Sequence, residues 1–182
     1  YLATDIETYY DKIVGTKDLT CLGFAYSKRD ALVIPYIGKN GQGRYWTPDE
    51  ELLIRKKVSE VLTTCRHVGH NAMHFDHQAL LCKEGMSSNF VDDTMFGVWS
   101  LYPELLKSLG FCSSIYTDLP YWKDELSKSR NGTLPRWKEF EYNGRDCIVT
   151  MQVALAVGAE FKEKSPALRA HYKFNIRVSR AY

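Results

Sequence analysis

The chain has 182 residues, of which 45% are hydrophobic and 25% are charged, and its formal net charge is +2. These values predict one globular domain with a core of its own, and they argue against a disordered chain and against a membrane protein. A net charge this close to zero does not indicate a nucleic-acid partner, so a basic surface would have to come from local clusters.

The N-terminal third predicts three strands and a helix. Residues 1–8 read as a buried strand, and residues 20–26 and 31–37 as a hairpin that follows it. A glycine-rich loop at 38–43 leads to Thr47, which with Glu50 has the pattern of a capping box, and Pro48 suits the first helical position. Apolar residues recur with helical spacing from residue 54 to residue 65, which predicts an amphipathic helix there.

The rest of the chain alternates helices and short strands. We expect strands at 68–71 and 90–91, a helix at 75–84 ending at Gly85, and a helix capped by Asp92 or Asp93 that runs to about Tyr102. A further helix is expected at 103–109, stopped by Gly110. Residues 117–136 are polar and read as a mobile, partly helical insertion. A long helix at 138–164 and a last helix after Ser165 complete an α/β fold.

Five cysteines are scattered along the chain, odd in number and without a Cys-x-x-Cys pair, which argues against a zinc knuckle or a disulfide framework. They are predicted to be small core residues of a protein in a reducing compartment. The chain starts on a strand without Met or a signal sequence, and it stops inside a helical pattern. We therefore expect one domain of a longer polypeptide. The cysteines are Cys21, Cys65, Cys82, Cys112 and Cys147.

Asp5 and Glu7 occupy alternate positions of the first predicted strand, so their side chains point to the same face. Like charges about 4 Å apart repel by roughly 4 kcal/mol at an effective dielectric near 20. A hard divalent cation, Mg²⁺ or Mn²⁺, is the natural partner for carboxylate oxygens in that position. The alternative is a strand end that carries two solvated acids.

Two later motifs can add to this pair. Asn71 and Asp76 lie where a predicted strand gives way to a helix, although Asp76 is equally explained as a favourable partner of the helix dipole. Tyr142 and Asp146 are four residues apart on the long helix and so share one face. Gly144 between them costs about 1 kcal/mol relative to Ala in a helix interior. A close approach by another backbone or by a ligand would account for it.

Together, Asp-x-Glu, Asn-x-x-x-Phe-Asp and Tyr-x-x-x-Asp, in this order and over nearly the whole chain, resemble the DnaQ-like DEDD superfamily of 3′-5′ exonucleases, in the branch with Tyr in the third motif. The matching residues are Asp5, Glu7, Asp76, Tyr142 and Asp146. Residues 93–95, 103–111, 114–117 and 120–125 are similar to the proofreading domain of phage-type family A DNA polymerases. The resemblance implies an RNase H-like fold with a mixed five-stranded sheet, a three-stranded meander followed by two short parallel strands, flanked by helices.

The resemblance also implies roles for the five matching residues. Four carboxylates would hold two Mg²⁺ or Mn²⁺ ions, with Asp5 shared by both. Glu7 and Asp146 would complete the site of the ion that activates water, Asp76 would serve the ion beside the leaving 3′ oxygen, and Tyr142 would orient the water.

Substrate contacts are expected from residues around the first two motifs. Asn71 matches the family position that touches the terminal nucleotide, and Thr8, Phe75 and His74 lie beside it or beside the acids. Tyr9 or Tyr10 could stack on a base where related polymerases have an apolar wedge, but ordinary core or rim packing is the favoured explanation for each. His74 likewise reads either as a pocket residue or as a polar surface histidine.

A second metal hypothesis is a zinc hydrolase built on His70, His74 and His77 with Asp76. It is disfavoured because His70 precedes the helix and no His-Glu-x-x-His motif is present.

Two basic sets are candidates for nucleic-acid contact. The last helix carries a stripe of basic residues, for which a solvated helix face is the usual explanation and nucleic-acid contact the alternative. The insertion interleaves basic and aromatic residues, which suits the tracking of a single strand. The stripe comprises Arg169, Lys173, Arg177 and Arg180, and the second set comprises Lys123, Lys128, Arg130, Arg136 and Lys138 with Tyr121, Trp122 and Trp137.

The sequence therefore predicts a metal-dependent exonuclease that releases nucleoside 5′-monophosphates from the 3′ end of single-stranded DNA and proofreads for a covalently attached polymerase. Residues 1–164 would form this domain, and residues 165–182 would begin a helix leading to the polymerase. We expect a monomer without membrane contact, in the cytoplasm, or in the host cytoplasm if a phage encodes it. The alternatives are a free-standing DNA or RNA exonuclease, and an inactive nucleic-acid-binding domain, which the complete set of acids and Tyr142 disfavours.

Overall fold

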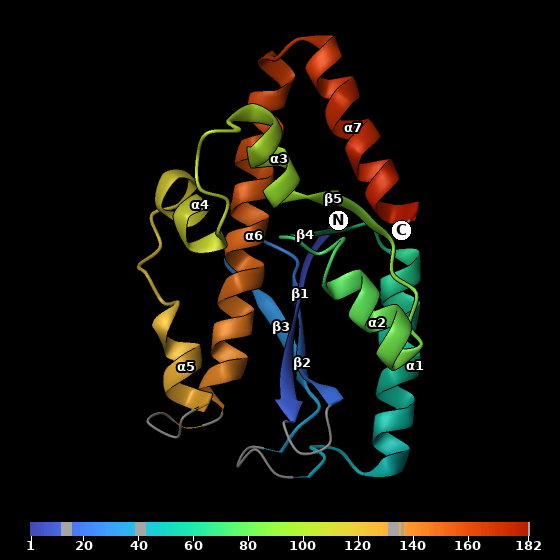
Figure 1. The fold of residues 1–182 in the computed structure, drawn as a ribbon. Coiled ribbons are helices and arrows are strands. Elements are labelled where there is room, and N and C mark those ends of the chain that lie inside the picture. The colour runs from blue at the N-terminus through green and yellow to red at the C-terminus, as the bar shows by residue number, and fades with distance from the viewer. Residues whose placement is uncertain (12–15, 39–42, 131–134, 136, 182) are drawn as a thin grey trace.

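The computed structural model describes residues 1–11, 16–38, 43–130, 135 and 137–181. Its strands and helices alternate after an initial meander, as expected (Figure 1). The strands are β1 Leu2–Asp11, β2 Thr16–Ala25, β3 Ala31–Pro35, β4 His67–Gly69 and β5 Phe90–Asp93. The helices are α1 Pro48–Thr64, α2 Asp76–Glu84, α3 Thr94–Leu101, α4 Leu109–Tyr116, α5 Asp124–Arg130, α6 Lys138–Glu163 and α7 Pro166–Ala181.

The five strands form one sheet in the order β3-β2-β1-β4-β5. β1 pairs antiparallel with β2 and β2 with β3, whereas β1 and β4, and β4 and β5, are parallel. Helix α6 lies along one side of the sheet, and α1 and α2 lie on the other (Figure 1). The predicted α/β fold, with a three-stranded meander followed by two short parallel strands, is confirmed.

Strand β1 divides its side chains between the two layers. Ala3 packs in a cluster with Cys147 and Met151 of α6, whereas Ile6 belongs to the core cluster that includes Leu80 of α2. Asp5 and Glu7 share the parity of Ala3, so they face α6. Directly after Glu7 the register of the pairing with β2 shifts by one residue, with Thr20 of β2 as the extra residue of a β-bulge, and the pairing then continues to Asp11. Such bulges often redirect side chains beside active sites.

Helix α6 lies very close to the sheet because glycines remove the side chains that would separate them. A Cβ atom on Gly23 of β2 would lie 2.3 Å from Asn143 Oδ1 and 2.6 Å from Cys147 Sγ. A Cβ atom on Gly144 would lie 3.3 Å from Val33 Cγ2. The close approach expected at Gly144 is therefore to a side chain of β3, and the tight packing places the next turn of α6 over β1.

The residues predicted to begin or end three of the helices do so in the structure. Thr47 and Glu50 form the capping box of α1, with Pro48 in its first turn. Gly85 ends α2 with a φ of 66°, a left-handed conformation that glycine adopts without strain. Of the two candidate caps for α3, Asp93 is the one used, and its carboxylate accepts hydrogen bonds from Met95 and Phe96 N–H.

The helix expected at 103–109 is wrong. Helix α4 begins only at Leu109, with Ser108 as its cap, so Gly110 lies inside the first turn and does not end a helix. The physical reason is a tertiary contact: a Cβ on Gly110 would lie 3.3 Å from Lys123 Cγ and 3.5 Å from Tyr121 Cε2. Glycine is used here for the close approach of the 121–123 segment.

The partly helical character expected of residues 117–136 is confirmed by α5, whereas the part that is described, expected as a mobile insertion, packs against the domain. Trp122 is only 2% exposed and packs in a core cluster with Val149 and Tyr142 of α6. Helix α5 follows, and Glu125 on it forms an ion pair with Arg145 of α6 at 2.9 Å. Residues 131–134 and 136 lie outside the described residues.

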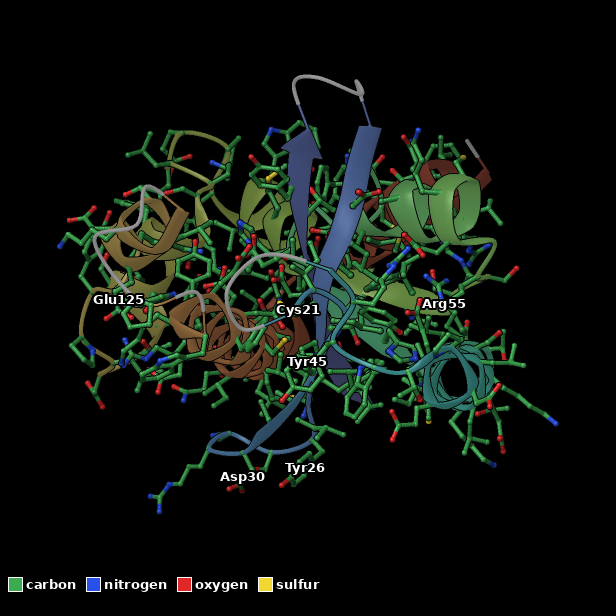
Figure 2. The ribbon with its side chains drawn as sticks, turned by 90° about the horizontal axis from the view of Figure 1, so that it is seen from below. Cys21, Tyr26, Asp30, Tyr45, Arg55 and Glu125 are labelled. Carbon is green, nitrogen blue, oxygen red and sulfur yellow. The ribbon has the colours of Figure 1, made fainter. Side chains whose placement is uncertain are left out.

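All five cysteines are free thiols. The prediction that they are core residues is confirmed for Cys21 (labelled in Figure 2), Cys112 and Cys147, but it is wrong for Cys82, which is exposed, and Cys65 is only half-buried. Within the described ranges no helix is both long and apolar enough to cross a membrane. Helix α7 folds back on the domain: Ile176 is buried in the main core, and the Tyr172 ring stacks on Phe161 with centroids 4.7 Å apart. The division proposed at residues 164 and 165 stays a prediction.

Candidate active site

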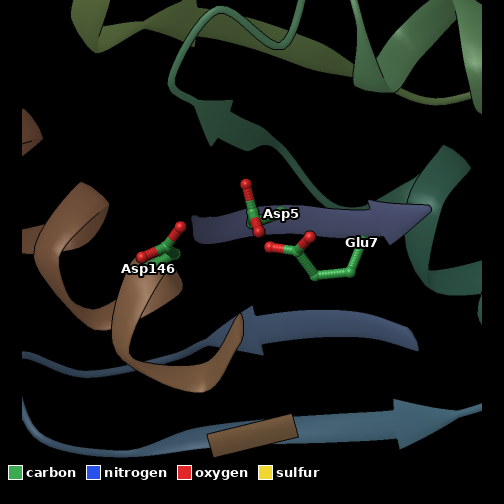
Figure 3. Close-up of side chains that lie close together, drawn as sticks. All are labelled: Asp5, Glu7 and Asp146. Atoms are coloured by element: carbon green, nitrogen blue, oxygen red, sulfur yellow. The ribbon is translucent and has the colours of Figure 1, made fainter. Parts of the chain in front are cut away.

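Three carboxylates from two elements converge on one point between β1 and α6 (Figure 3). Asp5 and Glu7 come from β1 and Asp146 from α6, and one oxygen atom of each lies within 4.8 Å of the other two. Glu7 and Asp146 are buried. The structure thus brings together two of the three sequence motifs, and the alternative of two solvated acids at a strand end does not apply.

Asp76 reaches the same region from the other layer. It is the first residue of α2 and is buried, and its Oδ1 accepts a hydrogen bond from the Ile6 N–H at 2.9 Å. Ile6 lies between Asp5 and Glu7, so this bond ties the second motif to the first. Asp76 is not part of the three-carboxylate cluster, and its role as a metal ligand stays a prediction.

Asn143 holds Asp5 in place from the side of α6. Its Nδ2 donates to Asp5 Oδ2 at 2.7 Å and to the Asp5 backbone oxygen at 3.2 Å. The Asn143 side chain also packs against Gly23, which has no side chain. This contact sets how far the Asn143 amide reaches towards the sheet. The orientation of Asp5 therefore depends on how closely α6 approaches the sheet.

Asp146 is held by two neighbouring residues of the loop before α5. Trp122 Nε1 donates to Asp146 Oδ1 at 2.6 Å, and Lys123 Nζ donates to Asp146 Oδ2 at 2.6 Å. Lys123 Nζ also donates to the Tyr142 hydroxyl at 2.9 Å. Tyr142 and Asp146 thus lie on one face of α6, as their spacing predicts, and a single ammonium group joins them.

The carboxylates raise one another's pKa. Burial first, and then the charges of Asp76 and Asp146, hold the pKa of Asp5 well above its usual range. Burial raises the pKa of Asp76 to about 7, although the Ile6 N–H opposes the shift. Burial also raises the pKa of Asp146, against the influence of the Lys123 ammonium. The ionised carboxylates repel one another in this site, and a bound cation would reduce that repulsion.

The surroundings of the Tyr142 hydroxyl favour its protonated form. Burial and the negative charges of Asp146 and Glu7 raise its pKa above the ordinary value. Its oxygen accepts from Lys123, and the hydroxyl itself hydrogen-bonds to the Asp146 carboxylate, which lowers the pKa of Asp146.

The donor set fits a divalent cation. Three carboxylate groups, each with an oxygen within 4.8 Å of the other two, offer the oxygen ligands that Mg²⁺ and Mn²⁺ prefer. The pKa values are raised because the carboxylates are buried away from water, and a bound metal ion would balance their charges in its place.

Asn71 adopts a left-handed conformation, with a φ of 62°. Asn tolerates this region better than most residues. The Asp93 carboxylate fixes the turn, because it accepts from Asn71 N–H at 3.0 Å and from Met73 N–H at 3.4 Å while it caps α3. Asp93 therefore aligns the second motif, and burial raises its pKa to about 6.

Three of the predicted substrate residues line one cavity of about 300 Å³ between β1 and α2. Thr8, His74 and Phe75 lie on its wall, together with Cys82 and Lys83. Asn71 and Tyr9 are not among the lining residues, and the Tyr9 side chain is 44% exposed. The Tyr10 side chain lies outside what is described, so the choice between base stacking and packing stays open for it.

The zinc hypothesis finds no support in the described part of the chain. The two ring nitrogens of His70 contact Thr94 Oγ1 and the Lys107 carbonyl oxygen, each at 2.8 Å. His77 Nδ1 contacts Ser88 Oγ at 2.8 Å. Both rings have structural partners, and the three-carboxylate cluster contains no histidine.

The predicted strand-tracking set is corrected at two residues. The Trp122 ring is buried and cannot stack on a base, and Lys123 is engaged with Asp146 and Tyr142. Tyr121 and Trp137 are exposed, and Lys138 pairs with Glu141 at 2.6 Å. The side chains of Arg130 and Arg136 lie outside the described residues. On α7, Lys173, Arg177 and Arg180 are exposed. This is compatible with nucleic-acid contact and with a solvated helix face.

Trp122, Lys123 and Asn143 are functional candidates that sequence reasoning missed in these roles. Asn143 directly follows Tyr142 inside the third motif, and this position in the sequence could have indicated that it lies near the acids. For Trp122 and Lys123 the available signal was weaker, a large aromatic residue within a polar segment.

The comparisons with known proteins bear on the fold. No protein-family model matches the chain, and no curated protein sequence matches it significantly. Among solved structures, one described as the apo form of a nuclease covers 99% of this chain and 81% of its own, with 14% identity and a TM-score of 0.72. NrnC of Brucella melitensis covers 98% and 82%, with 16% identity and a TM-score of 0.67.

The catalytic core of RRP6 from Trypanosoma brucei covers 98% of this chain and 46% of its own, with 15% identity and a TM-score of 0.69. Further structures of the Brucella NrnC contain bound Mg²⁺ (15% identity, TM-score 0.63) or pGG (16% identity, TM-score 0.52). At these identities the likeness establishes a shared fold, which is the RNase H-like fold expected from the sequence.

Proposed function

We propose that the protein is a metal-dependent 3′-5′ exonuclease that removes nucleoside 5′-monophosphates from the 3′ end of single-stranded DNA. The observation that carries this proposal is the convergence of Asp5, Glu7 and Asp146 within 4.8 Å, with Asp76 bound to the same strand. The resemblance to nuclease structures, one of them with bound Mg²⁺, supports the reaction class.

In this proposal the carboxylates hold Mg²⁺ or Mn²⁺, with Asp5 in the central position. Ions bound there would lower the pKa of water and stabilise the leaving oxygen. Tyr142, whose hydroxyl keeps its proton, hydrogen-bonds and orients the attacking water. Asn143 and Trp122 keep the Asp5 and Asp146 carboxylates in the geometry that this arrangement needs.

The cavity between β1 and α2 is the proposed site of the terminal nucleotide. Its volume of about 300 Å³ is of the size of small ligand pockets, and Thr8, the residue after Glu7, lies on its wall. Thr8 and His74 supply polar groups, and the Phe75 ring supplies a surface for stacking. Proofreading for an attached polymerase is the biological role we propose for such an activity.

A second candidate is a free-standing exonuclease that acts on short DNA or RNA. The observation that favours it is the likeness to NrnC, which has been solved with pGG bound. Matched DNA and RNA oligonucleotides, and a dinucleotide, separate the two candidates: preference for a long DNA strand supports the first and preference for the dinucleotide supports the second.

The test of the proposal is Asp5→Ala in an assay with a 5′-labelled single strand and Mg²⁺. The wild-type protein should produce a ladder of progressively shorter strands, because monophosphates leave from the 3′ end. Loss of the central metal ligand removes several kcal/mol of stabilisation, which corresponds to a rate at least about a thousandfold lower. The unfolding transition, and binding of the single strand compared with the wild type in EDTA, should be largely preserved.

Asp49→Ala is the matched control, because Asp49 is an exposed acid in the first turn of α1. This variant should cleave at the wild-type rate. Undiminished cleavage by Asp5→Ala, or cleavage by the wild-type protein that persists in EDTA, would refute the metal-dependent mechanism.

A further inference from the structure

Lys123 places a positive charge inside the carboxylate site. Its Nζ lies 2.6 Å from Asp146 Oδ2 and 2.9 Å from the Tyr142 hydroxyl, and its side chain is only 22% exposed. The ammonium also lies 4.8 Å from the centre of the Tyr142 ring and 5.2 Å from that of Trp122. This is not the geometry of a solvated surface lysine.

The surrounding fold holds the lysine there. Trp122, the residue before it, is buried in the core and bonded to the other oxygen of Asp146. Gly110 on α4 leaves room for the aliphatic part of the side chain, since a Cβ there would lie 3.3 Å from Lys123 Cγ. Packing on both sides therefore limits how far the ammonium can move away from Asp146.

The charges of the site make this position significant. Asp5, Glu7, Asp76 and Asp146 carry four negative charges when ionised, which two divalent cations would balance. The Lys123 ammonium adds one positive charge, so the site with two cations lacks one negative charge. A phosphodiester group carries one negative charge, and it would complete the balance in a buried place where charges interact strongly.

We propose that Lys123 weakens the binding of divalent cations to the free protein, so that the cations and the phosphodiester of the nucleic acid bind cooperatively. The inference rests on the proposed metal site and deepens it. Lys123 acts as a positioning residue through Asp146 and Tyr142, and it makes full metal loading depend on the substrate. By linkage, the metal must strengthen nucleic-acid binding by the same factor as the nucleic acid strengthens metal binding.

The experiment measures Mn²⁺ affinity by calorimetry, without and with a single-stranded DNA whose 3′-terminal linkages are phosphorothioates that resist cleavage. For the wild-type protein we expect the DNA to tighten Mn²⁺ binding at least about tenfold. For Lys123→Met we expect Mn²⁺ binding without DNA to be at least about tenfold tighter than in the wild type, and the effect of DNA to fall to about threefold or less. Lys123→Arg keeps the charge and should retain most of the cooperativity.

Lys57→Met is the control, because it removes one positive charge from α1, where the side chain is 69% exposed. It should change neither affinity. Thermal unfolding of each variant checks that it is folded, and Lys123→Gln replaces Lys123→Met if the latter is not. A solely structural role for Lys123 would weaken metal binding, the opposite direction.

The outcomes distinguish this inference from the proposed function. If the wild-type protein binds no Mn²⁺, the metal site itself is refuted. If the wild type binds Mn²⁺ but Lys123→Met binds it no more tightly without DNA, or if Lys57→Met tightens it equally, the role of Lys123 is refuted and the metal site stands.

Discussion

The two halves of the carboxylate site are built in different ways. On one side, Asp5 and Glu7 belong to a central strand that pairs on both edges, and glycine packing against α6 fixes their depth. On the other side, Asp146 depends on Trp122 and Lys123, which lie in the connection between α4 and α5. The strand provides the position of the ligands, whereas the connection provides the charge and hydrogen bonds that control one of them.

Because they are built differently, the strand side and the side of the connection should respond differently to mutation. A change on the strand side should act on the stability of the whole domain, because long-range packing is lost. A change on the side of the connection should act mainly on Asp146 and Tyr142, and so on metal binding and rate. Four variants or conditions test this contrast.

The largest effect on stability is expected for Gly23→Ala. The new Cβ would lie 2.3 Å from Asn143 Oδ1 and 2.6 Å from Cys147 Sγ, so these buried side chains, or α6 itself, must shift. Overpacking of this kind lowers the free energy of unfolding by about 3 kcal/mol. Urea denaturation measures the change, and an unaltered midpoint would contradict the tight packing of α6. Gly158→Ala is the control, because nothing lies within 4 Å of a Cβ there.

Trp122→Phe tests the side of the connection. The variant keeps an aromatic ring in the core but loses the bond from Nε1 to the buried Asp146 Oδ1. A lost hydrogen bond to a charged group corresponds to about 2 kcal/mol in the free energy of unfolding. Mn²⁺ affinity should change as well, because Asp146 is freed on one side. Exposed Trp137→Phe should alter neither quantity, and equal behaviour of both variants would exclude a special role of Trp122.

Tyr142→Phe acts where the two sides meet. The hydroxyl is lost while the ring stays in its core cluster, so metal binding should be preserved and the single-turnover rate should fall about tenfold to a hundredfold. Rapid-quench measurements at saturating Mg²⁺ give the rate. Equal rates for the variant and the wild type would refute a water-orienting role.

The last test concerns pH and the strand side. Burial raises the pKa of Asp76 to about 7, whereas the unfolded value lies near 3.9. Between these values the folded state binds more protons than the unfolded state, so the stability contributed below pH 4 is lost as the pH rises towards 7. In EDTA the free energy of unfolding should therefore fall from pH 5 to pH 8.

Asp76→Asn provides the comparison for this pH effect. Asn carries no proton to lose in this range, so the variant should show a shallower fall in stability over the same interval. Added Mg²⁺ should stabilise the wild type more at pH 8 than at pH 5, because protons no longer compete for the carboxylates. A wild-type stability that rises from pH 5 to pH 8 in EDTA would contradict the raised pKa.

Much of the scaffold was predictable because its signals are local. The capping box at Thr47, the left-handed end at Gly85 and the shared face of Tyr142 and Asp146 each depend on residues within about one turn. The boundary of α4 was not predictable in this way. Gly110 reads locally as a helix stop, and only its contact with Lys123 shows why glycine stands inside a helix.

The sequence by itself determined the fold class and the acids of the candidate site, because the alternation of a strand and the spacing of a helix already place Asp5 with Glu7 and Tyr142 with Asp146. Only the tertiary structure decided that these two pairs meet, and that Trp122 and Lys123 hold Asp146. The physical reason is the range of the interactions. Periodicity reports which residues share a face of one element, whereas contacts between residues about twenty or more positions apart depend on packing depth and on the path of the connection.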